Sequence, residues 1–323
     1  MEELRGKTPE EFLKEAAQVY LAAHSIQDSG RSETEFKTAI VVVLLWRWLE
    51  ASESELRASI DSVAEDEPDL ESGEPGTWDP DGWLEQMPTF DELSAYTAPH
   101  LSEYLEKKIT RHLQEACKDL FGHDDYSFAV AVGIALFIKF PHGLKQSLFA
   151  RLAQFDPLRQ EGRQTTLTWL EAISTFTCRE HRTGEYTTPK IISNLMVEIA
   201  NPRLGESTYD PCFGGGELLS AAARHMLAGS NLNEVGLQSP QVFGRELDVL
   251  PFLMGLTRLL YDNIEKPRLA LGDSLRVSGG TKIPVETQGK DGFDCILAQP
   301  PLGLRLDKGS TKGGLLSASI PMT

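Results

Sequence analysis

A change in hydrophobic pattern near residue 183 constrains the fold of this chain more than any other feature. Before that point, apolar residues recur at helical spacing. After it, short β-prone runs alternate with helical stretches. The runs predicted as strands are Ser207–Asp210, Val242–Glu246, Arg268–Leu271 and Phe293–Ala298, and the helices between them are Pro189–Ala200, Glu217–Leu227 and Leu250–Tyr261. Such alternation is typical of a parallel sheet with helices on both faces. We therefore predict a helical N-terminal domain, residues 1–182, followed by an α/β domain, residues 183–323.

The N-terminal part contains clear helix signals. Thr8 followed by Pro9 and Glu11 predicts a capped helix start, and Ser32–Glu35 repeats the capping pattern ahead of a more buried stretch. The almost wholly apolar run Phe128–Ile138 is long enough to favour a buried helix over a strand. The default function of such a domain is packing or assembly.

The net charge of −17 is unevenly distributed. Residues 61–92 contain twelve acidic residues and no Lys or Arg, and also four prolines. We expect this segment to be an exposed acidic loop, held in place by Trp78 or Trp83, because twelve uncompensated charges are costly to bury. The remaining residues carry a net charge of only −5, so no basic surface marks an autonomous DNA-binding protein.

Composition excludes several other classes. The longest apolar run without a glycine is the eight residues Ala39–Trp46, whereas a membrane-spanning helix needs about 20. The first residues lack the apolar core of a signal peptide. The four cysteines are far apart and form no Cys-x-x-Cys pair, so neither a disulfide framework nor a metal site is indicated. These features favour a cytoplasmic protein with no membrane segment.

Unusual residues follow the predicted strands, at the edge where doubly wound sheets bind their ligands. The first strand is followed by three consecutive glycines, Gly214–Gly216, and then by Glu217, which disfavours a phosphate at the helix start but not an ammonium or sulfonium group. Glu246 and Asp273 follow the next two strands, where carboxylates could accept hydroxyl or amino groups; single surface carboxylates are the simpler interpretation. The fourth strand leads into Gln299 and two prolines, which form a rigid turn.

Taken together and in this order, these motifs resemble the Class I methyltransferases that use S-adenosylmethionine. The resemblance is greatest to adenine-N6 DNA methyltransferases, and in particular to the modification (M) subunit of type I restriction–modification systems. Family motifs correspond to five segments from Thr183 to Gly303: Gly184–Pro189, Asp210–Leu218, Gly244–Glu246, Gly272–Leu275 and Gln299–Leu302. The resemblance implies an N-terminal helical domain followed by a Rossmann-like domain.

The same resemblance implies a role for each site residue. The segment that would cover the methionine end of S-adenosyl-L-methionine comprises Tyr186, Thr187, Thr188, Pro189 and Lys190. The residues that would lie near its amino-acid and ribose portions are Asp210, Gly214, Gly215 and Gly216. Glu246 would hold the ribose hydroxyls and Asp273 the adenine ring. The catalytic segment, which would face an adenine rotated out of double-stranded DNA, comprises Gln299, Pro300, Pro301 and Leu302.

The chain departs from the family pattern in this catalytic segment. Gln299 stands where the family has Asn, and its extra methylene would shift the amide by roughly 1 Å, a displacement that can cost about a hundredfold in rate. Leu302 replaces an aromatic ring that would stack on the flipped base. Thr187 and Glu217 also replace the usual Tyr and Gly. The site either accommodates Gln or has lost catalysis while keeping its fold.

The end of the chain also departs from the family pattern. A complete sheet of this class has about three more strands, so we expect the domain to be C-terminally truncated. The leading functional hypothesis is a DNA adenine-N6 methyltransferase subunit that works in a hetero-oligomer with a specificity subunit and a motor-nuclease subunit. The alternatives are a methylase-like scaffold that binds DNA, cofactor or partners without turnover, and a protein-glutamine methyltransferase.

Overall fold

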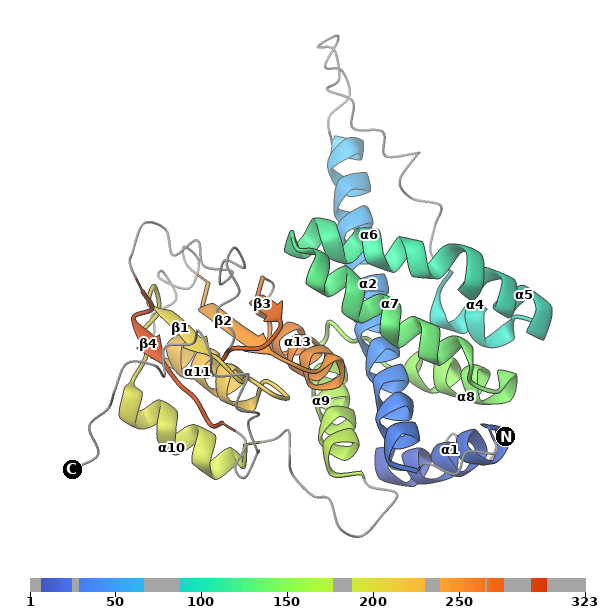
Figure 1. Ribbon diagram of the computed structural model, residues 1–323. Helices are drawn as coiled ribbons and strands as arrows, with labels where there is room; N and C mark the ends of the chain where they lie inside the picture. The colour runs from blue at the N-terminus through green and yellow to red at the C-terminus, as the bar shows by residue number, and fades with distance from the viewer. Residues whose placement is uncertain are drawn as a thin grey trace.

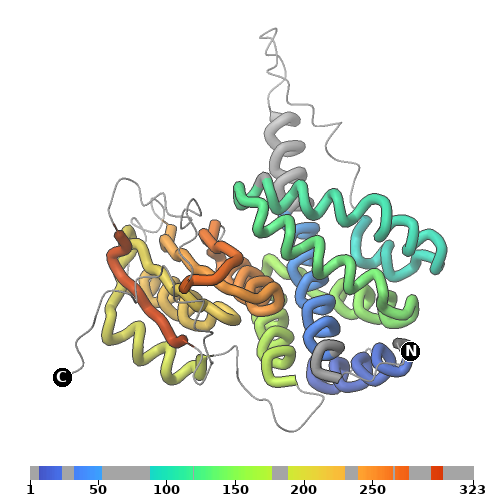
Figure 2. The backbone as a smooth tube through the Cα atoms, viewed as in Figure 1, coloured from blue at the N-terminus to red at the C-terminus, as the bar shows by residue number. Residues whose placement is uncertain are grey.

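The computed structural model describes residues 7–24, 29–66, 88–176, 188–229, 239–264, 266–275 and 292–300. A helical layer formed by the N-terminal half packs beside a smaller α/β layer (Figure 1). The backbone tube shows the same arrangement, with the last described strand on the side of the sheet away from the helical layer (Figure 2). The predicted order, a helical part followed by an α/β part with a parallel sheet, is confirmed.

The helical layer begins where its capping signals predict. Thr8 accepts a hydrogen bond from the Glu11 backbone at 3.3 Å, and the Glu11 carboxylate accepts one from the Thr8 backbone at 2.9 Å, which forms a capping box. The elements of the layer are α1 (Pro9–His24), α2 (Ser29–Asp66), α4 (Phe90–Ala95), α5 (Ala98–Tyr104), the π-helical turn η2 (Leu105–Ile109), α6 (Thr110–Phe121), α7 (Asp124–Ile138), α8 (His142–Leu152) and α9 (Gln160–Thr175).

Aromatic side chains form the centre of the helical core. Trp46 of α2 lies edge-to-face against Phe90 at 5.2 Å and Phe149 at 5.4 Å between ring centroids, and those two rings lie 5.1 Å apart. All three side chains are almost completely buried. Aromatic pairs in this geometry stabilise a fold by about 0.5–1.5 kcal/mol beyond the area they bury, so α2, α4 and α8 are fixed against one another.

The α/β layer is a parallel sheet in the order β3-β2-β1-β4. Its strands are β1 (Ser207–Asp210), β2 (Gln241–Glu246), β3 (Arg268–Leu271) and β4 (Cys295–Ile296), and its helices are α10 (Lys190–Ala200), α11 (Glu217–Ala228) and α13 (Val249–Tyr261). β1 and β2 pair in register from Ser207↔Gln241 to Asp210↔Gly244. Because α11 and α13 connect strands in the same direction along the sheet, right-handed crossovers place both on one face. Among the described residues, helices therefore cover one face, whereas the sequence predicted both.

Helix α13 is buried on all sides. Every residue from Leu250 to Tyr261 is buried, because the helix lies between the sheet and helices α2 and α9 of the other layer. The Tyr261 hydroxyl donates to the Leu44 carbonyl of α2 at 3.0 Å. Arg258 donates to the Gly215 carbonyl and to the Glu217 carboxylate. Most of the apolar core therefore forms one continuous cluster that spans both layers.

Helix α7 covers the free edge of β3. The Tyr126 hydroxyl accepts a hydrogen bond from the Leu269 backbone at 2.6 Å and donates one to the Pro267 carbonyl at 2.7 Å. The Asp125 carboxylate accepts from the Leu271 backbone at 2.9 Å. Exposed strand edges invite pairing with other chains, so these side chains protect the edge as well as satisfying it.

Three boundaries differ from the sequence predictions. Helix α2 begins at Ser29, so Ser32–Glu35 lie inside it, and it continues to Asp66, six residues into the predicted acidic loop. It ends two residues before Pro68, since a proline disfavours helical conformation in the residue before it. The loop also ends earlier than predicted, because Thr89 and Glu92 form a capping box for α4. Trp78 and Trp83 lie outside the described residues.

The fourth strand is shorter than predicted. Only Cys295–Ile296 pair with β1, opposite Thr208 and Tyr209. The backbone of Leu297 still donates to the Tyr209 carbonyl at 2.9 Å. In the described parts of the chain, no helix is both long and apolar enough to cross a membrane.

Candidate functional site

The loops after β1, β2, β3 and β4 meet at the carboxyl edge of the sheet. The Gly272 backbone donates to the Glu246 carbonyl at 2.7 Å, and the Phe213 backbone donates to the Arg245 carbonyl at 3.3 Å. The Ser274 hydroxyl donates to the Pro211 carbonyl. Parallel strands bring such loops together by construction, and these hydrogen bonds hold them in contact.

Glu246 lies directly against the glycine turn. One carboxylate oxygen accepts from the Gly214 backbone at 3.0 Å, and the other accepts from the backbones of Leu247 at 2.7 Å and Asp248 at 3.1 Å. Burial raises the pKa of this carboxyl, while the three backbone donors oppose the rise. The Glu246 side chain is therefore fixed at the glycine turn.

The glycine turn serves packing as much as ligand access. Gly216 has a φ of +80°, and a Cβ there would lie 2.8 Å from the Cα of Gly255 in α13. The helix α11 that follows can therefore approach α13 only through glycine at this position. A Cβ on Gly215 would lie 2.8 Å from the carboxylate of Glu217, so the space beside Gly215 is also filled.

Glu217 does not present a free negative charge at the start of α11. Its carboxylate pairs with the guanidinium of Arg258 at 2.8 Å, and both side chains are largely buried. Arg258 also donates to the Gly215 carbonyl at 2.8 Å. Burial raises the pKa of the Glu217 carboxyl and Arg258 lowers it. The sequence argument held that the negative charge of Glu217 disfavours a phosphate at the helix start. That reason is wrong, because Arg258 neutralises the charge of Glu217.

Asp210 is the most deeply buried carboxylate of the site. Only 2% of its surface is exposed, and burial raises its pKa from 3.8 to about 7. Its carboxylate accepts from the Cys212 backbone at 2.9 Å and from the Cys212 thiol. Burial and the neighbouring Asp210 raise the pKa of that thiol to about 12, so Cys212 is protonated at neutral pH and can donate.

Gln299 reaches this cluster from the end of β4. Its backbone N–H lies beside the Cys212 thiol and opposes the rise in that thiol's pKa, and the Cys212 backbone in turn donates to Asp210. Its side-chain carbonyl accepts from the Thr188 hydroxyl at 2.6 Å. Gln299 and Pro300 are both exposed to solvent.

The remaining predicted residues are placed only in part. Pro189 and Lys190 are exposed at the start of α10, where the Pro189 carbonyl accepts from the backbones of Ile192 and Ser193. Asp273 is half-buried, and its carboxylate accepts from the Leu275 backbone at 2.9 Å. Four predicted residues lie outside the described part of the chain: Tyr186, Thr187, Pro301 and Leu302. The binding and catalytic roles assigned from sequence stay predictions.

Two contributors were missed by the sequence analysis. Arg258 is the single charged residue of the otherwise apolar run Leu250–Tyr261, and a charge on a buried helix indicates a buried partner. Cys212 was taken only as part of a motif, yet it connects Asp210 to Gln299. No sequence signal distinguishes this cysteine from a simple packing residue.

The strand-end cluster fits a cationic ligand. Among the described residues, neither Asp210 nor Glu246 forms an ion pair, although Asp210 is almost completely buried and Glu246 is half-buried. A buried carboxylate without a counter-charge is stabilised by a bound cation, which is the charge of an ammonium or sulfonium group. The described residues contain no group of three or more His, Cys, Asp or Glu arranged to hold a metal ion.

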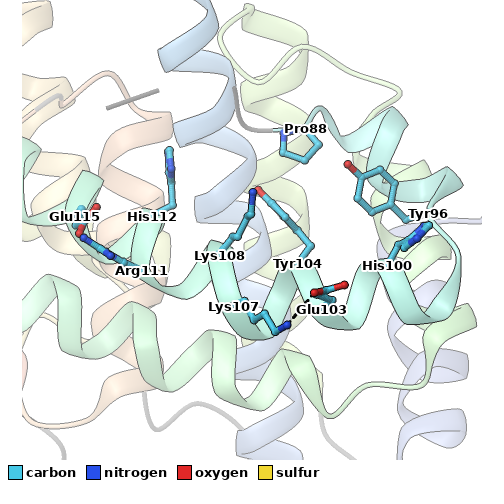
Figure 3. A pocket seen from close by; sticks show the side chains of 10 residues that line it. All are labelled: Pro88, Tyr96, His100, Glu103, Tyr104, Lys107, Lys108, Arg111, His112 and Glu115. Carbon is cyan, nitrogen blue, oxygen red and sulfur yellow. Dashed lines mark hydrogen bonds and ion pairs between the residues drawn. The ribbon is translucent and has the colours of Figure 1, made fainter. Parts of the chain in front are cut away.

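A separate hollow of about 850 Å³ lies on the helical layer, over α5, η2 and α6 (Figure 3). Its charges are largely balanced, because Lys107 pairs with Glu103 at 2.8 Å and Arg111 pairs with Glu115 at 2.7 Å. Both pairs are exposed. Since it lies on a different layer from the strand ends, we do not assign it to the same site.

Comparison with known proteins agrees with the site. The N-6 DNA methylase family matches residues 171–313. Two curated relatives are the EcoEI type I restriction enzyme methylase subunit of Escherichia coli, 31% identical over 37% of this chain and 24% of its own length, and the MjaVIII methylase subunit of Methanocaldococcus jannaschii, 29% identical over 40% of this chain and 21% of its own length. The chain therefore spans about a quarter of the length of these relatives.

Solved structures share the fold at lower identity. A chain from a structure of a type I restriction–modification system, described in terms of complex assembly and conformational transition, matches with a TM-score of 0.55 and 17% identity over 94% of this chain and 58% of that one. A modification subunit of a putative type I restriction enzyme from Vibrio vulnificus matches with a TM-score of 0.51 and 21% identity over 93% of this chain and 62% of that one. The chain is thus similar to the N-6 DNA methylases over residues 171–313, and to methylase subunits of type I restriction enzymes over 123 to 131 residues.

Proposed function

We propose that the chain is the modification subunit of a type I restriction–modification or related defence system, and that it transfers a methyl group to the N6 atom of adenine in double-stranded DNA. The observation that carries the proposal is that Gln299, Asp210 and Glu246 lie close together at the carboxyl edge of the sheet. An amide acceptor and a carboxylate cluster are the two parts that such a transfer needs, one for the substrate amine and one for the cofactor.

The cofactor of this proposal is S-adenosyl-L-methionine, which supplies an electrophilic methyl group on a sulfonium centre. Glu246 would bind the ribose hydroxyls, because its carboxylate is fixed at the glycine turn and a carboxylate can accept from two hydroxyls. Asp210 would lie near the positively charged amino-acid portion, and Asp273 near the adenine ring. The backbone of the segment Thr188–Lys190 would cover the methionine end, because the Thr188 side chain is bound to Gln299.

The chain's own contribution to the transfer is to hold and orient the adenine amine. The Gln299 side-chain carbonyl and the Pro300 backbone carbonyl would each accept a hydrogen bond from the amine, so that the nitrogen lone pair points towards the methyl group. Holding reactants in line at about 3 Å accounts for a large part of the rate enhancement in such reactions. The base would be rotated out of the duplex, with Pro301 and Leu302 beside it.

The proposal includes partners and a location. Relatives of this kind are subunits of restriction enzymes, and one structural neighbour is described as part of an assembling complex. We therefore propose a cytoplasmic hetero-oligomer with a specificity subunit that reads the DNA sequence and a motor-nuclease subunit.

The test uses the full-length protein assembled with its partner subunits. Calorimetry first measures S-adenosylmethionine binding to the wild type, to Glu246→Gln and to the surface control Glu198→Gln, whose side chain is 72% exposed. We expect Glu246→Gln to weaken binding tenfold or more and the control to leave it unchanged. DNA is then incubated with the assembly, digested to nucleosides and analysed for N6-methyladenine by mass spectrometry. Cofactor binding without DNA methylation would support a scaffold instead. The absence of both cofactor binding and methylation would refute the proposal.

A further inference from the structure

Thr188 and Gln299 are 111 positions apart in the chain but share a hydrogen bond. The Thr188 hydroxyl donates to the Gln299 side-chain carbonyl at 2.6 Å. Thr188 precedes α10, and Gln299 follows β4. The contact therefore joins the beginning of one element to the end of another at the proposed site of transfer.

The backbones on both sides of this contact are anchored. The Pro189 carbonyl accepts from Ile192 at 2.8 Å and from Ser193 at 3.0 Å, which fixes the residue next to Thr188 at the first turn of α10. Beyond β4, the Leu297 backbone donates to the Tyr209 carbonyl at 2.9 Å. Leu297 also packs in a buried cluster with Val197 of α10, so α10 and the end of β4 are held together beneath the contact.

The Thr188 hydroxyl gives the exposed Gln299 side chain a contact that fixes its conformation. Gln299 is exposed, so packing does not select its conformation, and glutamine has one more rotatable bond than asparagine. A carbonyl oxygen has two lone pairs. One accepts from Thr188, and the other stays available for an amine N–H.

The length of the glutamine matches this arrangement. With the backbone of residue 299 held as observed, an asparagine would fall short of the Thr188 hydroxyl by about 1 Å, and a displacement of that size matters at a reacting centre. Gln299, which stands where the family has Asn, is therefore long enough to reach Thr188. We infer that Thr188 is a positioning residue, which holds the Gln299 carbonyl where the adenine amine is received; this inference rests on the proposed function.

The experiment compares three variants in the full-length protein with its partner subunits. Thr188→Val removes the hydroxyl at nearly constant volume, and Thr188→Ser retains it. Thr165→Val makes the same chemical change on α9, where the hydroxyl bonds only its own helix, to the Glu161 carbonyl. Single-turnover methyl transfer to DNA is measured at saturating S-adenosylmethionine, and the cofactor dissociation constant and Tm are measured in parallel.

We expect Thr188→Val to lower the single-turnover rate tenfold or more, with Thr188→Ser within threefold of the wild type and Thr165→Val unchanged. The cofactor dissociation constant should stay within twofold in all variants. A wild-type rate in Thr188→Val, an equal loss in Ser and Val, or a dissociation constant that rises in proportion to the rate loss would each overturn the inference. A wild-type assembly that methylates no DNA would refute the proposed function, and the inference with it.

Discussion

Replacing Asp210 with asparagine should stabilise the protein at neutral and alkaline pH. The carboxyl is 2% exposed, and burial raises its pKa from 3.8 to about 7. A folded-state pKa above the unfolded one means that the folded protein holds more protons between about pH 4 and 7. The free energy of unfolding therefore falls as pH rises through that window, and the full cost is present above pH 7.

The size of the effect follows from the shift. Each pKa unit corresponds to 1.36 kcal/mol, so a rise from 3.8 to about 7 sets an upper limit of about 4 kcal/mol. Asparagine keeps an oxygen that can accept from the Cys212 backbone, but its new N–H₂ group has to find a partner. We therefore expect Asp210→Asn to be more stable than the wild type by about 1–3 kcal/mol at pH 8 and to show little difference at pH 4.5.

Urea denaturation at a series of pH values, without cofactor, measures this difference. Glu10→Gln, an exposed carboxylate in the first turn of α1, is the matched control and should show no comparable pH-dependent gain. An Asp210→Asn variant that is less stable than the wild type at pH 8, or a difference that does not change with pH, would refute the burial argument. The same variant should bind S-adenosylmethionine more weakly, since the ligand's cationic groups lose a carboxylate.

Three further changes test the architecture and the site. Tyr126→Phe leaves the Leu269 N–H without its acceptor and should lower the free energy of unfolding by about 1–3 kcal/mol in urea titrations; an unchanged value would mean that the edge of β3 is not held by this hydroxyl. Arg258→Met should lower the free energy of unfolding by about 3–5 kcal/mol, because Glu217 loses its buried partner. In a double-mutant cycle, adding Glu217→Gln should recover part of this loss. Additive losses would contradict the pairing. Gln299→Asn should reduce methyl transfer tenfold or more, whereas a gain in rate would show that the site prefers the shorter side chain.

The sequence predicted the local elements well. Strands β1 and β3 begin and end where predicted, at Ser207–Asp210 and Arg268–Leu271, and helices α11 and α13 differ by one residue at one end. These elements are short and have strong periodicity or clear turn residues on both sides, so local information suffices. Helix α2 was harder, because capping residues such as Ser32 also occur inside helices and its acidic end contains no helix breaker before Pro68.

The sequence predicted which loops form the site, but not how its residues interact. Strand topology alone places Asp210, Glu246 and Gln299 at one edge. The neutralisation of Glu217 by Arg258 and the contact of Thr188 with Gln299 join residues 41 and 111 positions apart. Neither pair has a periodic signature, since each depends on how two elements pack in space. The sequence alone could therefore suggest that Gln299 is a defect, but it could not reveal that Gln299 is hydrogen-bonded to Thr188.

The complete burial of α13 has a consequence for how such chains can diversify. One side of the helix packs on the sheet and the other on α2 and α9, with the Tyr261 hydroxyl bound to Leu44. The N-terminal helices therefore cannot be exchanged between related proteins as an independent cassette, even though the sequence pattern changes sharply near residue 183. A successful natural or engineered recombinant would have to inherit α13 together with its N-terminal partners, so the inherited unit extends across the apparent boundary.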